Sequence, residues 1–116
     1  MSINVEVNGV LFTAVLEDNK AAIALAEMLE KNPLTIRMSD YGGFEKVGSL
    51  GRSLPAENAQ IRTKPGDIVL YQGDQIVIFY GTNSWSYTML GHIEALEGWD
   101  DALGKADVTM TLSVAS

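Results

Sequence analysis

The residue types that carry nucleophilic or metal-assisted chemistry are scarce in this sequence. The chain has no cysteine, which excludes a thiolate nucleophile, a thiolate metal site and a disulfide framework. Its one histidine, His92, has apolar neighbours and excludes a metal site built from several imidazoles. The acids Asp100 and Asp101 lie near the start of an expected short helix, where carboxylates complement the macrodipole. We interpret these residues as structural and predict no metal and no cofactor.

The aromatic residues are better candidates for a binding function. Several lie in segments rich in glycine or serine, where a partly exposed ring often lines a pocket. Filling a core is the alternative for each ring, and it is our interpretation of Phe79. The glycines at 42, 43, 48 and 51 match neither phosphate-loop pattern and indicate turns. The candidate rings are Tyr41, Phe44, Tyr71, Tyr80, Trp85 and Tyr87.

Arg37 is the candidate for polar chemistry on an expected strand. Leu34, Ile36 and Met38 alternate with polar residues, and if they face the core, Arg37 points outward beside the following loop. An outward guanidinium can donate hydrogen bonds to a ligand. The alternative is an exposed pair with an acid such as Glu6, which contributes little stability.

Length and composition describe one globular domain spanning residues 1–116. The 116 residues are 47% hydrophobic and 20% charged, which is typical of a folded chain with a modest core. A net charge of −7 repels polyphosphates, so nucleic acid and anionic membranes are not expected partners. The chain shows no targeting segment and no apolar run of roughly 20 residues, which predicts a cytoplasmic protein.

The first third of the chain predicts a hairpin followed by a helix. Residues 3–7 alternate, Asn8-Gly9 favours a type I′ turn, and residues 10–16 return as the second strand. Asp18 or Asn19 can cap the helix that follows. That helix ends at Asn32-Pro33, and its apolar stripe consists of Ala22, Leu25, Ala26 and Leu29.

The remainder predicts mainly strands. A third strand at 34–39 precedes a long glycine-rich loop at 40–64, in which short strands are possible. Strands 67–71 and 75–80 form a hairpin joined at Gly73-Asp74, and residues 76–80 are apolar on both faces, which predicts a central strand. Seven or eight strands and two helices are consistent with a closed β-barrel. The remaining expected elements are a strand at 88–94, a helix at 98–103 ended by Gly104, and a strand at 107–114.

Residues 65–103 carry a distinctive order of motifs. These are Pro65-Gly66, the strand at 67–71, Gly73-Asp74-Gln75-Ile76-Val77-Ile78, Trp85, Leu90-Gly91-His92-Ile93, and the helical segment 97–103. Their order and spacing resemble those of cyclophilins, the barrel-shaped peptidyl-prolyl isomerases, with a small deletion after Trp85. The first hairpin, the helix and the third strand also match the order of elements at the start of a cyclophilin.

Four further motifs look like a small prokaryotic cyclophilin-like family, and this resemblance covers nearly the whole chain. It implies a mainly β protein, a closed cyclophilin-like β-barrel of about eight strands with two helices. It implies little about function. The motifs are Tyr41-Gly42-Gly43-Phe44-Glu45-Lys46, Ser53-Leu54-Pro55, Pro65-Gly66-Asp67-Ile68 and Asn83-Ser84-Trp85-Ser86-Tyr87-Thr88.

The resemblance implies only part of an isomerase site. Rotation about an X–Pro bond faces a barrier of about 18–20 kcal/mol, because amide resonance opposes it. Cyclophilins weaken that resonance with an arginine on the third strand, and they hold the proline ring in an apolar pocket. By this resemblance Arg37 is the catalytic arginine and Trp85 the family's tryptophan. The pocket phenylalanine falls at Val77, an alanine of the pocket wall falls at Tyr71, and the family's histidine has no counterpart.

Three functions follow as hypotheses. The first is a cyclophilin-like protein that binds proline-containing or other extended peptides in an aromatic groove, with weak or absent isomerase activity. The second is a genuine isomerase in which Tyr41 or Tyr87 replaces the missing histidine. The third is a pocket for an apolar small molecule, narrowed by Tyr71. The sequence does not predict the oligomeric state. The expected ligand-binding residues are Arg37, Tyr41, Phe44, Tyr71, Val77, Tyr80, Trp85 and Tyr87.

Overall fold

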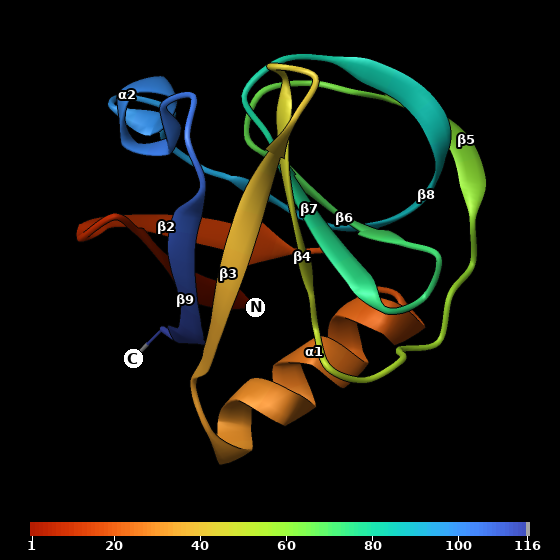
Figure 1. The fold of residues 1–116 in the computed structure, drawn as a ribbon. Coiled ribbons are helices and arrows are strands. Elements are labelled where there is room, and N and C mark those ends of the chain that lie inside the picture. The colour runs from red at the N-terminus through yellow and green to blue at the C-terminus, as the bar shows by residue number, and fades with distance from the viewer. Residues whose placement is uncertain (116) are drawn as a thin grey trace.

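The structure, a computed structural model, describes residues 1–115. This part of the chain forms nine strands and two helices (Figure 1). In chain order they are β1 (Ser2–Val7), β2 (Val10–Leu16), α1 (Lys20–Lys31), β3 (Leu34–Tyr41), β4 (Glu45–Ser49), β5 (Ala59–Thr63), β6 (Asp67–Tyr71), β7 (Gln75–Phe79), β8 (Asn83–Ile93), α2 (Trp99–Leu103) and β9 (Val108–Val114).

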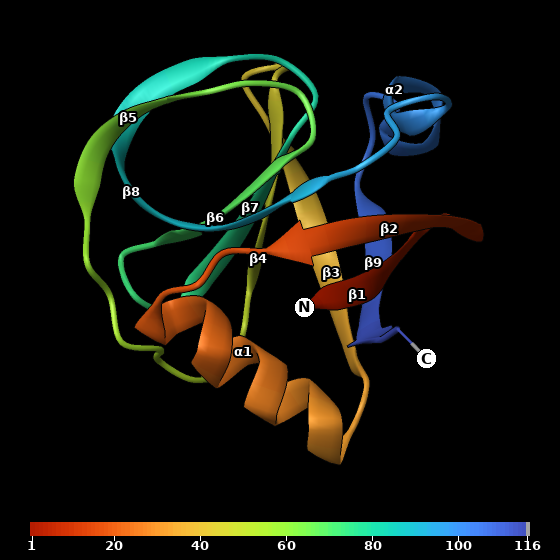
Figure 2. The ribbon, with the colours of Figure 1, turned by 180° about the vertical axis from the view of Figure 1, so that it is seen from behind.

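Eight of the strands close into a ring. The strand order is β2-β1-β9-β3-β4-β7-β6-β8-β5, and antiparallel pairing of β2 with β8 closes the ring. The ninth strand, β5, lies outside the ring and pairs only with the first part of β8. Figure 2 shows β5 and the first part of β8 curving away from the other strands, on the far side of the molecule from β9. The predicted closed barrel with two helices is therefore confirmed.

The two hairpins follow the turn chemistry of their sequences. Asn8 and Gly9 both have positive φ angles, 49° and 80°, as the type I′ turn between β1 and β2 requires. In the second hairpin the positive φ angles fall at Gln72 (52°) and Gly73 (79°), one residue before the expected Gly73-Asp74 position. Tyr71 pairs with Gln75, so three residues connect the two strands. In this register the turn falls at the first two of these residues.

The N-cap of helix α1 is Asn19, one of the two predicted caps. The Asn19 side-chain oxygen accepts a hydrogen bond from the backbone N–H of Ala22 (2.9 Å), and its Nδ2 donates to the carbonyl oxygen of Met89 (2.8 Å). Asn19 therefore both caps the helix and attaches it to β8. The predicted stripe is buried against the barrel, together with Ala21.

Replacing Asn19 by alanine should lower the free energy of unfolding by about 1–2 kcal/mol, since the cap and the bond to Met89 are lost together. Asp18→Ala is the matched control, because Asp18 is exposed and makes no capping bond. Urea denaturation of both variants measures the difference. Equal losses would contradict the assignment of the cap to Asn19.

The barrel has a separate apolar layer on each side of its wall near β6 and β7. Ile68, Leu70, Ile76 and Ile78 face the main core inside the ring. Val69, Val77 and Phe79 belong to a second cluster on the outer face. Strands β6 and β7 are therefore buried on both faces, as the continuous apolar run at 76–80 predicts.

Several boundaries differ from the sequence-based expectations. The segment 40–64, expected to be mainly loop, contains β4, β5 and the end of β3. Strand β8 begins five residues earlier than the predicted 88–94 strand, because its first part pairs with β5. His92 is exposed. No helix among residues 1–115 has the length and hydrophobicity needed to cross a bilayer.

Candidate functional site

The second apolar cluster, here called the outer cluster, lies between the barrel wall and strands β5 and β8. Its rings meet edge to face, with Tyr87 5.7 Å from Phe79 and 6.0 Å from Tyr71 between ring centroids. These separations are typical of favourable aromatic pairs. Its buried members are Val69, Val77, Phe79 and Tyr87, and its half-buried members are Phe44, Val47, Ile61, Tyr71 and Met89.

The outer cluster brings together four of the predicted ligand-binding residues, Phe44, Tyr71, Val77 and Tyr87. Val77 is only 1% exposed and Tyr87 only 4% exposed, so neither offers a free surface in this structure. A fifth predicted residue, Tyr41, is 64% exposed at the rim of the cluster. Its ring lies edge-on to Phe44, with 5.9 Å between centroids.

Arg37 and Trp85 lie apart from these packed rings. Arg37 is exposed on β3, which confirms its outward orientation. No ion pair in residues 1–115 involves Arg37, so the alternative pair with Glu6 is not formed. The reason is that β9 lies between β1 and β3. Trp85 is 55% exposed on β8, directly opposite Ile61 of the edge strand β5.

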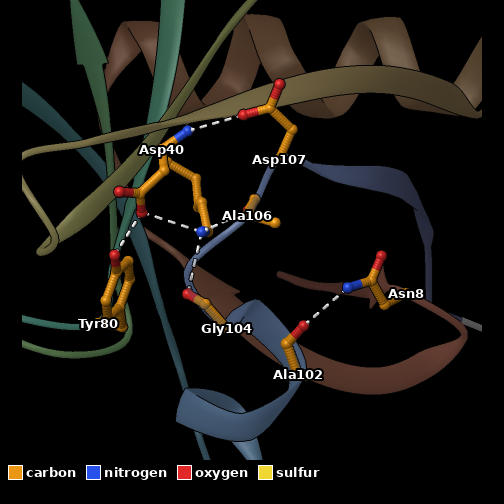
Figure 3. Close-up of polar contacts among 8 residues, drawn as sticks. Asn8, Asp40, Tyr80, Ala102, Gly104, Ala106 and Asp107 are labelled. Atoms are coloured by element: carbon orange, nitrogen blue, oxygen red, sulfur yellow. Dashed lines mark hydrogen bonds and ion pairs between the residues drawn. The ribbon is translucent and has the colours of Figure 1, made fainter.

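Tyr80, also predicted to line the groove, instead contacts charged residues at one end of the barrel (Figure 3). Its hydroxyl donates to the carboxylate of Asp40, which also accepts from the Nζ of Lys46 at 2.9 Å. The Lys46 side chain is completely buried and makes two further bonds, to the carbonyl oxygens of Gly104 (3.0 Å) and Ala106 (2.6 Å). Lys46 thus joins β4 to the segment between α2 and β9.

Asp40, Lys46 and Tyr80 form a structural network in which the charged and polar groups bind one another or the backbone. The hydrogen bond from Tyr80 and the ammonium of Lys46 lower the pKa of Asp40, although burial opposes them. Burial, and then the hydrogen bond to Asp40, raise the pKa of Tyr80 to about 12. The three donors of Lys46 all have acceptors. The network therefore holds the barrel end together and leaves Tyr80 without a free polar group for a ligand.

Glu45 is the polar residue of the outer face that sequence reasoning missed. It lies opposite Tyr41 on β3 and Phe79 on β7, and therefore shares the outer face with Phe79. Its side chain is only 6% exposed, and no hydrogen bond or ion pair in residues 1–115 involves its carboxylate. Burial, and then the negative charge of Asp40, raise its pKa to about 7. Nothing in the sequence around a single glutamate after a Gly-Gly turn indicates that its side chain is buried.

Two shallow depressions border α1, away from the outer cluster. One, of about 390 Å³, lies beside the start of the helix and is lined partly by Glu17, Glu27 and Glu30. The other, of about 250 Å³, lies between the helix and residues 52–55. No group of three or more potential metal ligands gathers anywhere in the described part of the chain. The outer face is distinguished by a buried carboxylate without a partner, that of Glu45, beside the exposed ring of Tyr41.

Comparison with known families agrees with the barrel and with the order of its motifs. The model of the Cyclophilin-like family matches residues 5–114. No curated protein matches the sequence. Since the family match spans nearly the whole chain and the structure is an eight-stranded closed barrel, the chain belongs to the Cyclophilin-like family.

Proposed function

We propose that this protein binds extended peptides, including proline-containing ones, along β5 and the outer cluster, and has weak or absent prolyl isomerase activity. The observation that carries the proposal is the free edge of β5 beside the exposed ring of Trp85. β5 pairs with β8 on one side and has no strand on the other within residues 1–115. Unpaired backbone groups of this kind can accept an additional strand from a partner.

The side chains near this edge suit a peptide ligand. Trp85 and Ile61 face each other across the two strands, and Ile61 is only half-buried in the outer cluster. An added strand would place alternate side chains beside these apolar groups, while its backbone bonded to β5. Aromatic surfaces also accommodate proline rings, which favours proline at such a position.

Weak or absent isomerase activity is supported by the packing around Val77. The resemblance to cyclophilins places a residue of the proline pocket here, and in this chain Val77 is 1% exposed. Tyr87 packs in the same cluster and is itself 4% exposed. A proline ring could enter only if these side chains moved apart, which would expose apolar surface to water.

Trp85→Ala should weaken the binding of a six-residue extended peptide about tenfold, because the ring supplies the largest exposed apolar contact beside β5. NMR titration of the isotopically labelled protein measures the affinity, and we expect amide shifts concentrated in residues 59–63. Leu11→Ala is the matched control, since Leu11 is an apolar residue 62% exposed on a distant hairpin. Equal weakening in both variants, or shifts confined to other strands, would contradict the proposal.

A genuine isomerase is the second candidate function, favoured by the exposed Arg37 without an ion-pair partner. NMR exchange on short X–Pro peptides tests it with the wild type and with Arg37→Ala. We expect neither protein to accelerate exchange appreciably over the uncatalysed rate. Acceleration by the wild type that disappears in Arg37→Ala would instead establish an isomerase in which Arg37 is the electrophile.

A further inference from the structure

Glu45 is surrounded by aromatic rings from several parts of the chain. Tyr41 and Phe79 are its cross-strand neighbours, and such neighbours have Cβ atoms about 4.5–5.5 Å apart. Phe44 precedes it in sequence and lies edge-on to Tyr41. Tyr87 packs on Phe79 and is close enough for the charge of Glu45 to affect its hydroxyl. The carboxylate therefore lies in an apolar and aromatic environment.

The Glu45 carboxylate lacks a partner but is not sealed from solvent. No hydrogen bond or salt bridge in residues 1–115 involves it. In the same part of the chain, every side-chain nitrogen or oxygen that is fully sealed from solvent has a hydrogen-bond partner. Because the Glu45 oxygens have none, they must retain some contact with solvent. The carboxylate is therefore buried but not completely closed off from the outside.

Neither Lys46, which follows Glu45 in the sequence, nor Asp40 neutralises the Glu45 carboxylate. Lys46 is opposite Ile78 of the main core, so it points to the inner face of the barrel and binds Asp40 there. Asp40 is an acid and disfavours the ionised form of Glu45. An ionised Glu45 thus lacks a positive partner within the described chain, a costly state for a buried carboxylate.

An organic ammonium group is the partner that this environment fits best. A carboxylate supplies the opposite charge, and aromatic rings attract cations through their negative faces. A hard metal ion requires several oxygen ligands, whereas no group of three potential ligands occurs in residues 1–115. The net charge of −7 also favours approach of a cation over an anion.

We infer that Glu45, together with the rings of Tyr41 and Phe44, forms a binding site for an alkylammonium group, such as the side chain of a lysine. We assign the ammonium group to a lysine of the peptide ligand, and this assignment rests on the proposed peptide-binding function. The ammonium site itself does not depend on the peptide, because its contacts are confined to the outer face around β3 and β4.

The site should respond to pH through Glu45. Tyr41 on β3 is the titratable group directly opposite it, while Asp40 on the inner face of β3 and Tyr87 on β8 interact with it through their charges. The pKa of Asp40 lies below its ordinary value and that of Tyr87 lies above its ordinary value, so neither changes charge between pH 6 and 8. With the Glu45 pKa near 7, the ionised fraction rises about tenfold over this interval, and ammonium affinity should rise with it.

The experiment uses n-butylammonium chloride as the probe, with n-butanol and sodium chloride as neutral and ionic-strength controls. NMR titration of the labelled protein should show saturable shifts around residues 41–45 and 79, about tenfold tighter at pH 8 than at pH 6. Glu45→Gln should weaken binding at least tenfold at pH 8 and remove the pH dependence. Glu57→Gln, which changes an exposed acid, should bind as the wild type does.

Tyr41→Ala provides a second variant that does not depend on the pH response. Because Tyr41 is 64% exposed, its removal should leave the fold intact and weaken n-butylammonium several-fold. Unchanged binding in both Glu45→Gln and Tyr41→Ala, or the absence of saturable shifts in the wild type, would overturn the inference.

A matched pair of peptides separates this inference from the proposed function. One peptide carries lysine and the other carries norleucine, which has no charge, at the same position. Tighter binding of the lysine peptide, lost in Glu45→Gln, supports both proposals. Equal binding of the two peptides at β5 overturns only the lysine assignment. Binding of n-butylammonium without binding of either peptide overturns only the peptide function.

Discussion

Replacing Glu45 by glutamine should stabilise the protein above pH 7 by up to about 3 kcal/mol. The folded-state pKa of about 7 lies roughly 2.5 units above the ordinary value of 4.5, and each unit corresponds to about 1.4 kcal/mol. Because the folded state holds the proton more tightly, wild-type stability from this group is complete below pH 4.5. It is lost as the pH rises through 7. Glutamine does not ionise, so the variant avoids this loss.

Urea denaturation of the wild type and Glu45→Gln between pH 4 and pH 9 measures the effect. The two proteins should differ little at pH 4, and the difference should grow to its full size by pH 8. Glu57→Gln controls for the general effect of removing a negative charge from an acidic protein, and it should show no such transition. A difference independent of pH would contradict the burial of an unpaired carboxylate.

This stability cost bears on function. A buried carboxylate without a partner is a strained feature that most folds avoid, and such features tend to occur at functional sites. An ammonium ligand would supply the missing charge and recover part of the cost. The same substitution is therefore expected to stabilise the free protein and to weaken the binding of n-butylammonium at pH 8.

Replacing Lys46 by methionine should destabilise the protein by about 3 kcal/mol. Methionine keeps much of the side-chain length but removes the charge and all three hydrogen bonds, to Asp40, Gly104 and Ala106. Removing one partner of a buried ion pair costs about 3–5 kcal/mol. The lower end of this range applies here, because the Asp40 side chain is 22% exposed and keeps the hydrogen bond that the Tyr80 hydroxyl donates.

Denaturation at pH 7 measures this loss, and Lys105→Met is the matched control because Lys105 is exposed. Hydrogen exchange adds a local measurement. Protection should fall first in residues 104–109, since Lys46 attaches this segment to β4. A loss below about 1 kcal/mol, or faster exchange spread evenly over the barrel, would show that Lys46 is not the link between these elements.

Most of the fold was predictable because its signals are local. Asn8-Gly9 adopts the two positive φ angles that define the first turn, and Asn19 offers its side chain to the first turn of α1. The continuous apolar run of β7 correctly predicts a strand covered on both faces. Each signal depends on residues within a few positions of one another. The motifs of residues 65–103 and their order indicated the cyclophilin-like barrel through the resemblance that they carry.

The candidate site was only partly predictable. Strand periodicity placed Arg37 outward, and the sequence pointed to Phe44, Tyr71, Val77 and Tyr87, which the outer cluster brings together. The sequence did not distinguish the exposed Tyr41 from the buried Tyr87, because both lie in glycine- or serine-rich segments.

The sequence by itself determined most of the elements and their order, and its motifs indicated the family, but it did not determine β4 and β5. Only the tertiary structure decided which outward-facing residues are exposed. Strand alternation places Glu45 on the outer face of β4, a position that is normally solvated. Residues of β5 and β8, far along the chain, form the outer cluster beside it. Tyr80 is held by Asp40 and Lys46 for the same reason, since their contacts form when the barrel closes. Burial and charge pairing depend on such long-range contacts, which sequence periodicity does not encode.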